Sequence, residues 1–431
     1  MSPARTFQHR ALAVLAAGAL ALTSAGLAAP GAAAAADAKP GASAQAERKQ
    51  QVRFATYNAS LNRSTEGALV ADLGTGDDAQ AQKIAEVIQI SAPDVVLLNE
   101  FDYDAGHKAA DLFRTNYLEV SQNGKVPVQY PYVYTAPSNT GIPSGMDLNN
   151  DGTVGGADDA LGFGQFEGQY GMVLYSKYPI DIRNVRTFQN FLWKDMPGAL
   201  LPDNPATARP GDWFTDEELA AVRLSSKSHW DVPVTIDGST VHVLASHPTP
   251  PVFDTDEDRN GRRNSDEIRF WADYIRGGQD ARYIYDDGGA RGGLDRSADF
   301  VVLGDLNSDP ADGESLDGSI SQLLELKEIQ DPLPAAEGAA EASVLQGRVN
   351  LEHRGDPALD TADFEDATAG NLRVDYALPS KTLKVRGSGI FWPRAGTPGS
   401  ELTGVYPFPT SDHRLVYVDV DVASPSDSRR N

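Results

Sequence analysis

The sequence predicts an α/β domain whose polar side chains collect at one edge of its sheets. Six short apolar runs each end in a polar cluster, which is typical of buried strands with functional residues at their carboxyl ends. Between the first two runs, Ile84, Val87 and Ile88 recur at helical spacing, and Pro93 ends that helix. A later segment, 415–422, alternates apolar and polar residues, which predicts a half-exposed strand. The six runs are 52–58, 95–100, 172–176, 241–247, 300–305 and 373–378.

The amino-terminal segment has the pattern of a secretory signal peptide. Arg5 and Arg10 precede an apolar run at 11–27, and small residues ending at Ala36 follow it. A membrane anchor is the alternative, but the run is short and rich in alanine, and no later segment approaches the roughly 18 apolar residues that a span needs. We therefore expect a secreted protein without stable membrane anchoring. The expected parts are a signal peptide (1–36), a mobile amino-terminal segment (37–51), one domain (52–422) and a mobile tail (423–431).

The composition is that of a globular protein without disulfides. Of the 431 residues 41% are hydrophobic and none is cysteine, so the fold must rely on its core, on bound metals or on both. The formal net charge of −24 argues against a long polyanion as the main ligand, because nonspecific nucleic-acid binding depends on Lys and Arg. We expect a monomer that acts on a small or soluble substrate.

Seven short motifs carry the candidate chemistry. Each is weak alone, because an Asn after a strand is commonly a turn residue and an Asn-Glu pair is commonly a helix cap. Together they occur in the order found in the endonuclease/exonuclease/phosphatase superfamily, which the chain resembles from residue 52 to residue 420. The motifs at 304–307 and 411–414 are the most specific. The seven are Thr56-Tyr57-Asn58, Asn99-Glu100, 171–177, Ser246-His247, Gly304-Asp305-Leu306-Asn307, Val374-Asp375-Tyr376 and Ser411-Asp412-His413.

The resemblance implies a DNase I-like fold, a four-layer sandwich of two stacked mixed β-sheets flanked by helices. It also implies a phosphoester hydrolase that uses Mg²⁺ or Mn²⁺. Such an enzyme places a water in line with the leaving oxygen, neutralises the phosphate oxygens and stabilises the leaving oxygen. Asp, Glu and Asn supply the oxygen ligands that hard cations prefer.

The same resemblance implies a role for each matching residue on the metal and water side. Glu100 is similar to the central metal ligand, assisted by Asn58 and Asp412. Asp305 corresponds to the base that orients or deprotonates the attacking water. Asn307 corresponds to a residue that binds a phosphate oxygen.

Two histidines complete the implied site. His413 would contact the scissile phosphate, and Asp375 would hold its imidazole in one tautomer by accepting the other N–H. His247 corresponds to the second histidine, which assists the leaving oxygen or the phosphate. A single histidine is usually structural, but these two fall in matching motifs.

The segment 147–158 fits the EF-hand pattern of calcium ligands, except that Asp replaces the usual Glu at the twelfth position. An acidic solvated loop is the alternative. A second segment, 256–267, fits less well because Arg263 stands where an apolar residue belongs, and there we favour a solvated loop. The expected ligands of a structural Ca²⁺ are Asp147, Asn149, Asp151, Thr153 and Asp158.

Arginines and aromatic residues could line a substrate cleft. The loop after His247 borders the active site in the superfamily, so Arg262, Arg263 and Arg269 are candidates for bidentate phosphate contacts. The alternative is a helix that starts near Ser265 and carries ordinary surface arginines. Further candidates for the cleft are Phe188, Phe191, Trp193 and the stretch 223–230, although aromatic residues are more often part of the core.

The expected function is hydrolysis of organic phosphoesters outside the cell, as a phosphodiesterase or a phosphomonoesterase, with water attacking phosphorus in line. A secreted nuclease is the first alternative, in which nucleic acid is a substrate only. A sphingomyelinase-like phospholipase would need an exposed apolar hairpin, which only 188–193 or 391–392 could supply. A calcium-dependent binding module without catalysis is the alternative outside the enzymes.

Overall fold

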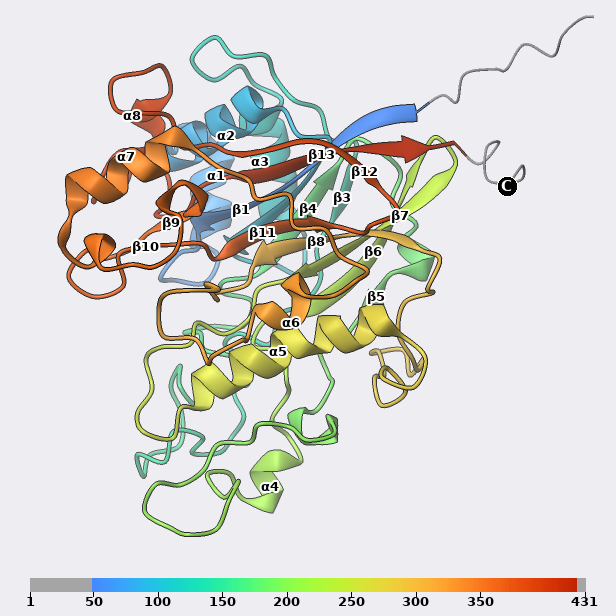
Figure 1. The fold of residues 1–431 in the computed structure, drawn as a ribbon, viewed down its shortest axis with the longest axis vertical. Helices are drawn as coiled ribbons and strands as arrows, with labels where there is room; N and C mark the ends of the chain where they lie inside the picture. The colour runs from blue at the N-terminus through green and yellow to red at the C-terminus, as the bar shows by residue number, and fades with distance from the viewer. Residues whose placement is uncertain (1–48, 425–431) are drawn as a thin grey trace, which may run out of the picture. The chain divides into compact units, whose positions relative to one another are not determined.

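The computed structural model describes residues 49–424, which form thirteen strands and eight α-helices (Figure 1). The strands are β1 (Lys49–Leu61), β2 (Val95–Phe101), β3 (Tyr132–Tyr134), β4 (Met172–Ser176), β5 (Arg186–Thr187), β6 (His229–Ile236), β7 (Ser239–Ser246), β8 (Asp299–Asp305), β9 (Ala362–Asp363), β10 (Asn371–Leu372), β11 (Asp375–Pro379), β12 (Lys384–Ile390) and β13 (Val416–Ala423). The α-helices are α1 (Ala68–Thr75), α2 (Ala79–Ser91), α3 (Lys108–Phe113), α4 (Asp216–Leu219), α5 (Arg259–Arg276), α6 (Ser321–Leu324), α7 (Glu337–Gln346) and α8 (Ser400–Thr403).

Two mixed sheets carry the fold. The first has the strand order β12-β13-β1-β2-β4-β3, and the second has the order β11-β8-β7-β6-β5. One parallel pair lies inside each sheet, β1 with β2 and β7 with β8, while the other neighbours run antiparallel. All six apolar runs predicted as buried strands lie in these sheets, in β1, β2, β4, β7, β8 and β11.

The core divides into three apolar layers, which gives the four-layer arrangement. Side chains of both sheets, such as Phe54, Leu97, Val232 and Val301, pack together between them. The outer face of the first sheet packs against α1, α2 and α3, and the outer face of the second packs against α5 and α6. The predicted sandwich of two stacked sheets flanked by helices is confirmed.

The boundaries of the domain differ slightly from the expected ones. β1 begins at Lys49, because residues 49–51 pair with Asp421, Val422 and Ala423 of β13. Those three residues, expected to be mobile, are therefore part of the sheet, as is Ala423 of the expected tail. The expected signal peptide, the rest of the expected amino-terminal segment and residues 425–431 lie outside the described residues. Within the described part, no helix is long and apolar enough to cross a membrane.

The half-exposed strand predicted at 415–422 is buried on both faces. Asp419 and Asp421 of β13, expected to face solvent, are under 10% exposed. Arg53 donates to both carboxylate oxygens of Asp419, at 2.7 and 2.8 Å, and Arg386 pairs with Asp421. The alternating pattern placed the strand correctly, but long-range ion pairs cover its polar face.

The aromatic segments proposed as an exposed hairpin are packed into the core. Phe188, Phe191 and Trp193 of the first segment are each at most 1% exposed. In the second segment, Trp392 is 5% exposed, and Phe391 is partly buried against the core beneath the first sheet. Neither segment is therefore the exposed apolar hairpin that a sphingomyelinase-like enzyme would need.

One buried amide ties the two sheets together at the edge where the polar residues collect. Asn99 of β2 is fully buried, and its Oδ1 accepts from Thr56 Oγ1 at 3.3 Å and from the backbone N–H of Asp305 at 3.4 Å. Its Nδ2 donates to the carbonyl of Ser246 at 3.4 Å. Thr56 lies in the first sheet, whereas Asp305 and Ser246 end β8 and β7 of the second.

We expect Asn99→Ala to lower the free energy of unfolding by about 2 kcal/mol, because it leaves buried polar groups of both sheets without hydrogen-bond partners. Chemical denaturation measures the change. Asn190→Ala, in an exposed loop, is the matched control and should change stability by less than about 0.5 kcal/mol. Equal stability of the two variants would contradict a linking role for Asn99.

Candidate active site

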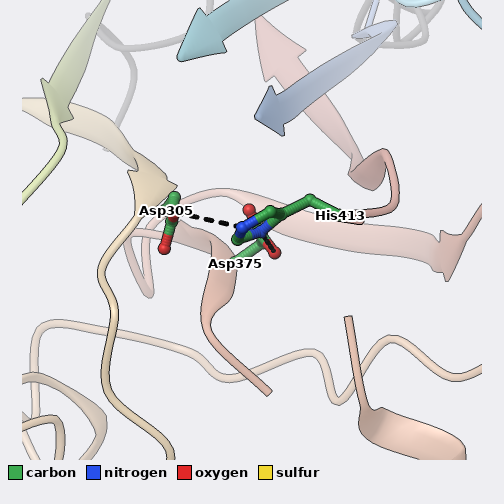
Figure 2. A group of neighbouring side chains, drawn as sticks. All are labelled: Asp305, Asp375 and His413. Carbon is green, nitrogen blue, oxygen red and sulfur yellow. Dashed lines mark hydrogen bonds and ion pairs between the residues drawn. The ribbon is translucent and has the colours of Figure 1, made fainter. Parts of the chain in front are cut away.

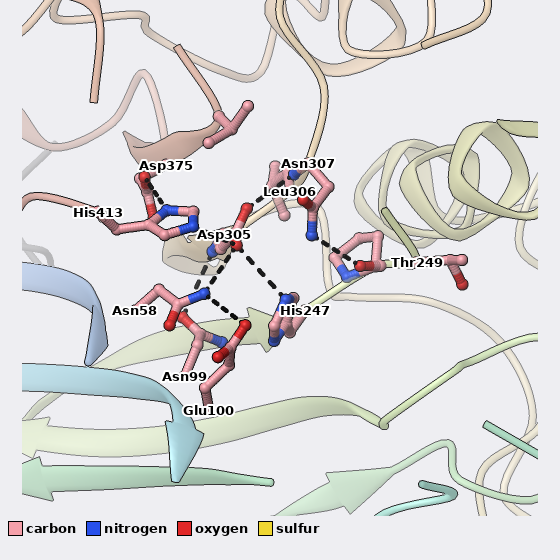
Figure 3. Close-up of polar contacts among 12 residues, drawn as sticks. Asn58, Asn99, Glu100, His247, Thr249, Asp305, Leu306, Asn307, Asp375 and His413 are labelled. Carbon is pink, nitrogen blue, oxygen red and sulfur yellow. Dashed lines mark hydrogen bonds and ion pairs between the residues drawn. The ribbon is translucent and has the colours of Figure 1, made fainter. Parts of the chain in front are cut away.

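Strand register brings the predicted site residues to one edge of the sandwich (Figure 3). In the parallel pair β1–β2, Asn58 lies opposite Asn99, which places Glu100 one residue further along. In the antiparallel pair β8–β11, Asp305 at the end of β8 lies opposite Asp375 at the start of β11. Residues more than 300 positions apart, Asn58 and His413, thus share one site.

Backbone strain accompanies two of these residues. Glu100 has φ 56° and Asn307 has φ 51°, both in the left-handed region that non-glycine residues rarely adopt. Asn307 is held there because its N–H donates to Asp305 Oδ1 at 2.9 Å and its Nδ2 donates to the carbonyl of Pro248 at 3.1 Å. Such strain is concentrated at functional sites, where surrounding contacts maintain it.

Gly304 allows β8 to approach β7 closely just before the site. A Cβ atom at this position would lie 2.1 Å from the carbonyl oxygen of Ser246, which is backbone and cannot move aside. The glycine of the 304–307 motif is therefore needed for the close approach of the two strands that carry Asp305 and His247.

Asp305 is the centre of the polar network. Its carboxylate is 1% exposed, and Oδ2 accepts from Asn58 Nδ2 at 3.1 Å. The same oxygen lies 3.4 Å from His247 Nε2 and 3.6 Å from His413 Nε2. Burial raises the pKa of Asp305 to about 7, although the nearby His413 opposes the shift. Two imidazoles and one amide thus face a carboxylate that titrates near neutrality.

His413 lies between two carboxylates (Figure 2). Its Nδ1 is 2.9 Å from Asp375 Oδ2, and its Nε2 faces Asp305. Burial alone would lower the pKa of His413, but Asp375 and Asp305 together raise it well above its usual value. Asp375 is itself fully buried, and the backbone N–H groups of Val374 and Asp375 both donate to Thr361 Oγ1 at 3.0 Å. The contact with Asp375 Oδ2 orients the imidazole of His413.

His247 has a different environment. It is 3% exposed, and its Nδ1 has no hydrogen-bond partner among the described residues. Burial, Lys227 and His413 lower its pKa well below the ordinary value. The pKa values of the two histidines are therefore shifted in opposite directions, although both Nε2 atoms lie within 4 Å of Asp305 Oδ2.

Glu100 presents its carboxylate beside this network. Asn58 Nδ2 donates to Oε1 at 3.1 Å, and Asn62 Nδ2 donates to Oε2 at 2.8 Å. Burial raises the pKa of Glu100, and the charge of Asp412 raises it further, while Asn58 and His413 oppose both effects. Asp412 is partly exposed and accepts from Ser60 Oγ at 3.4 Å.

The donor set fits a hard divalent cation. Carboxylates of Glu100, Asp305 and Asp412 supply oxygen atoms at one edge of the sandwich, and oxygen is the ligand that such cations prefer. Asn58 turns its Nδ2 toward Glu100 and Asp305, while its Oδ1 accepts the N–H of Ser60 at 3.2 Å. Asp305, Asp375 and His413 also bring ligand atoms within 4.8 Å of one another, so these three could hold a metal ion. In that trio, however, His413 and Asp375 are already joined by a hydrogen bond.

A cavity of about 520 Å³ opens beside Glu100 and His247. Lys227 lines it as well, is 7% exposed, and was not identified by any motif, although the stretch 223–230 was a candidate for the cleft wall. Burial lowers the pKa of Lys227, while Glu267, Glu100 and Asp305 oppose that shift. A lysine before a strand has no distinctive pattern, so sequence reasoning could not single it out.

Glu267 positions two segments that border this cavity. It is fully buried in α5, and its carboxylate accepts the N–H of Ser226 at 2.7 Å and the N–H of Thr249 at 2.6 Å. These residues neighbour Lys227 and His247. The second calcium pattern, 256–267, is thus neither a calcium loop nor the solvated loop that we favoured, because its last residue is enclosed and bonded to the backbone.

The three candidate arginines have protein partners in the structure. Arg263 donates to the carbonyls of Leu224 at 2.8 Å and Leu161 at 2.7 Å, although it does line the cavity. Arg269 donates to the carbonyls of Pro197 and Gly198 at 3.2 Å, and Arg262 faces Asp203 at 3.8 Å. Their guanidinium groups hold neighbouring loops, which argues against the expected contacts with a phosphate. The helix begins at Arg259, earlier than the alternative start near Ser265.

In the loop predicted to bind Ca²⁺, acidic side chains accept hydrogen bonds from the backbone N–H groups of the loop itself. Asp147 accepts the N–H of Asp151 at 3.1 Å and that of Gly152 at 2.8 Å, and Asp151 accepts the N–H of Thr153 at 2.7 Å. Asp158, the expected twelfth-position ligand, is exposed and lines the cavity instead.

Its neighbour Asp159 turns inward. Asp159 is 2% exposed, and it accepts the N–H groups of Leu148 and Gly155, each at 2.7 Å. The residue that closes the loop is therefore one position later than the pattern predicts. Asn149 keeps the expected inward orientation, with Oδ1 accepting the N–H of Asp151 at 3.1 Å.

One protein family matches this chain in comparisons with known proteins. The profile described as "Endonuclease/Exonuclease/phosphatase family" matches residues 55–413. No curated protein matches the chain.

Several solved structures are similar at low identity. An endonuclease/exonuclease/phosphatase from Beutenbergia cavernae is 17% identical, with 87% of this chain and 72% of that chain covered and a TM-score of 0.46. An endonuclease/exonuclease/phosphatase family protein from Bacteroides thetaiotaomicron is 12% identical, with 87% and 96% covered and a TM-score of 0.45. A mannosyl-6-phosphatase from the same organism is 13% identical, with 86% and 99% covered and a TM-score of 0.42.

We expect Glu267→Ala to lower the free energy of unfolding by about 2 to 4 kcal/mol, since it leaves two buried N–H groups without an acceptor. Hydrogen exchange should accelerate in the peptides that contain Ser226 and Thr249. Arg276→Ala, at the exposed end of the same helix, is the control and should leave both peptides protected. Unchanged exchange in Glu267→Ala would contradict the positioning role.

Proposed function

This chain belongs to the endonuclease/exonuclease/phosphatase family, and from that premise we propose that it is a divalent-metal-dependent hydrolase of organic phosphoesters that acts outside the cell. Members of the superfamily hydrolyse phosphoesters. The observation that carries the proposal is the buried Asp305 carboxylate, faced by Asn58, His247 and His413. Export rests on the signal-peptide pattern of the sequence.

Each residue has a distinct task in this proposal. Asp305, with a pKa of about 7, accepts a proton from the attacking water, since a base is most effective when its pKa lies near the working pH. His413, whose pKa Asp375 and Asp305 raise, binds an oxygen of the scissile phosphate. Asn307 binds a second phosphate oxygen through its partly exposed side chain.

Glu100 and Asp412 are the residues that would hold the cation, and Asn58 would join them by turning its Oδ1, which now accepts the N–H of Ser60, toward Glu100. When bound there, Mg²⁺ or Mn²⁺ would neutralise charge on the phosphate and help to activate water. The acidity of the whole chain and the small cavity beside the site support a small organic phosphoester over a long nucleic acid.

The test is turnover of bis-p-nitrophenyl phosphate, p-nitrophenyl phosphate, sphingomyelin and plasmid DNA, with Mg²⁺, Mn²⁺ or Ca²⁺ and with EDTA. We expect metal-dependent cleavage of the small esters. Asp305→Asn and His413→Ala should fold normally and lose at least about 100-fold in kcat, because each removes a group that acts on the reacting atoms.

The other outcomes separate the alternatives. Cleavage of DNA alone would favour a nuclease, and cleavage of sphingomyelin alone would favour a phospholipase. No turnover of any of the four substrates by the folded protein would favour a binding module. Wild-type turnover by both variants would overturn the assignment of Asp305 and His413.

We also propose that Asp147, Asn149, Asp151, the Thr153 carbonyl and Asp159 hold a structural Ca²⁺. Side-chain oxygens of Asp147, Asn149, Asp151 and Asp159 accept backbone N–H groups of this one loop, and oxygen ligands of this kind suit Ca²⁺. Asp159 replaces the predicted Asp158 because it is the residue that faces the loop.

Calcium at about 100 times its dissociation constant should stabilise the protein by about 2.7 kcal/mol, and chelation should lower the melting temperature by several degrees. Differential scanning calorimetry with and without EGTA measures this shift. Asp151→Ala should abolish the shift, whereas Asp256→Ala, in the other candidate loop, should retain it. A wild-type protein with no shift would exclude the calcium site.

A further inference from the structure

The cavity beside the site has a distinct composition. Aromatic and aliphatic side chains form most of its wall, and they include Leu161, Phe163, Trp193, Phe214 and Phe253. Its volume of about 520 Å³ lies in the range of pockets that bind small organic molecules. An apolar wall of this kind favours a flat apolar group over a sugar or a polyol, which would lose hydrogen bonds to water.

The cavity borders some of the proposed reacting groups and not others. It is lined by Glu100 and His247 but not by Asp305, His413 or Asp375. In an in-line displacement the leaving oxygen lies opposite the attacking water. The cavity is lined by His247, the histidine expected to assist the leaving oxygen or the phosphate, and not by Asp305, the proposed base, which favours the cavity as the leaving-group side.

Lys227 is the cation of the cavity wall that has no side-chain ion pair or hydrogen bond among the described residues. The other two cations are engaged, since Arg263 donates to backbone carbonyls and Arg259 pairs with Glu257. Lys227 is more than nine-tenths buried and borders the same cavity as Glu100 and His247. A buried ammonium group is retained at a cost in solvation, which an anionic ligand would offset.

We infer that this cavity is the leaving-group subsite, that it binds a flat aromatic group, and that Lys227 contacts the oxygen joining that group to phosphorus. This inference rests on the proposed function. As water oxygen bonds to phosphorus and its proton passes to Asp305, the P–O bond to the organic group breaks with its electron pair on the leaving oxygen. Lys227 donates a hydrogen bond to that oxygen and stabilises its charge.

Benzyl and methyl phosphoesters, each as a monoester and as a diester, test the aromatic part, because both have alcohol leaving groups of similar basicity. The full-length wild-type enzyme should prefer the benzyl ester at least about tenfold in kcat/KM, from burial of one ring. Phe253→Ala and Phe163→Ala change exposed rim residues, 86% and 52% exposed, and should reduce the preference severalfold through KM. Val126→Ala, at an exposed position elsewhere, should retain it.

A second experiment tests Lys227. Lys227→Met should lower kcat at least about tenfold more for the methyl ester than for a 4-nitrophenyl ester, because a poor leaving group needs the stabilisation more. A purely structural role would lower both rates equally. Lys125→Met, which removes a lysine paired with Glu86 at 3.8 Å, is the control and should change neither rate.

The failure of this inference differs from the failure of the proposed function. Equal turnover of benzyl and methyl esters would overturn the aromatic subsite and leave the hydrolase intact. Binding of benzylphosphonate and methylphosphonate to Asp305→Asn, measured by calorimetry, provides a readout without catalysis. Tighter binding of benzylphosphonate without turnover of any ester would overturn the hydrolase and support the subsite, and equal binding would overturn the subsite.

Discussion

Burial of negative charge at the meeting edge of two sheets is the constraint on which the rest of this structure depends. Asp305 and Asp375 are almost completely enclosed, and Glu100 lies beside them. Isolated carboxylates in such a place would carry a large solvation penalty. Asn58, two histidines and backbone N–H groups offset it, and they come from both sheets. The sandwich must therefore be assembled for the charges to be tolerated.

The same constraint explains the supporting residues outside the motifs. Asn99 links the two sheets just beneath the carboxylates, and Glu267 fixes the segments that carry His247 and Lys227. Neither residue reaches the reacting atoms in the proposed mechanism. Both satisfy backbone groups that would otherwise be buried without partners, and in doing so they set the distances between the groups that react.

The sequence predicted the strands because they follow from local patterns, and the resemblance to the superfamily implied which residues at their ends form the site. Apolar runs defined β2 and β8, and Glu100 and Asp305, which the resemblance singled out, lie near the carboxyl ends of those strands. Lys227 and the inward turn of Asp159 depend on the folded path of loops, which no local pattern encodes. The polar face of β13 was misjudged for the same reason, since Arg53 is distant in sequence from Asp419.

The pairing of β1 with β13 has a consequence for how the protein is made. These strands join residues 49–56 to residues 416–423, so the first sheet cannot close until nearly the whole described chain is available. Closing so long a loop is slow and leaves apolar strand edges exposed meanwhile. Asn58 lies on the first of these strands and His413 just before the last, so catalytic competence would arise late, as folding is completed, rather than in stages during synthesis.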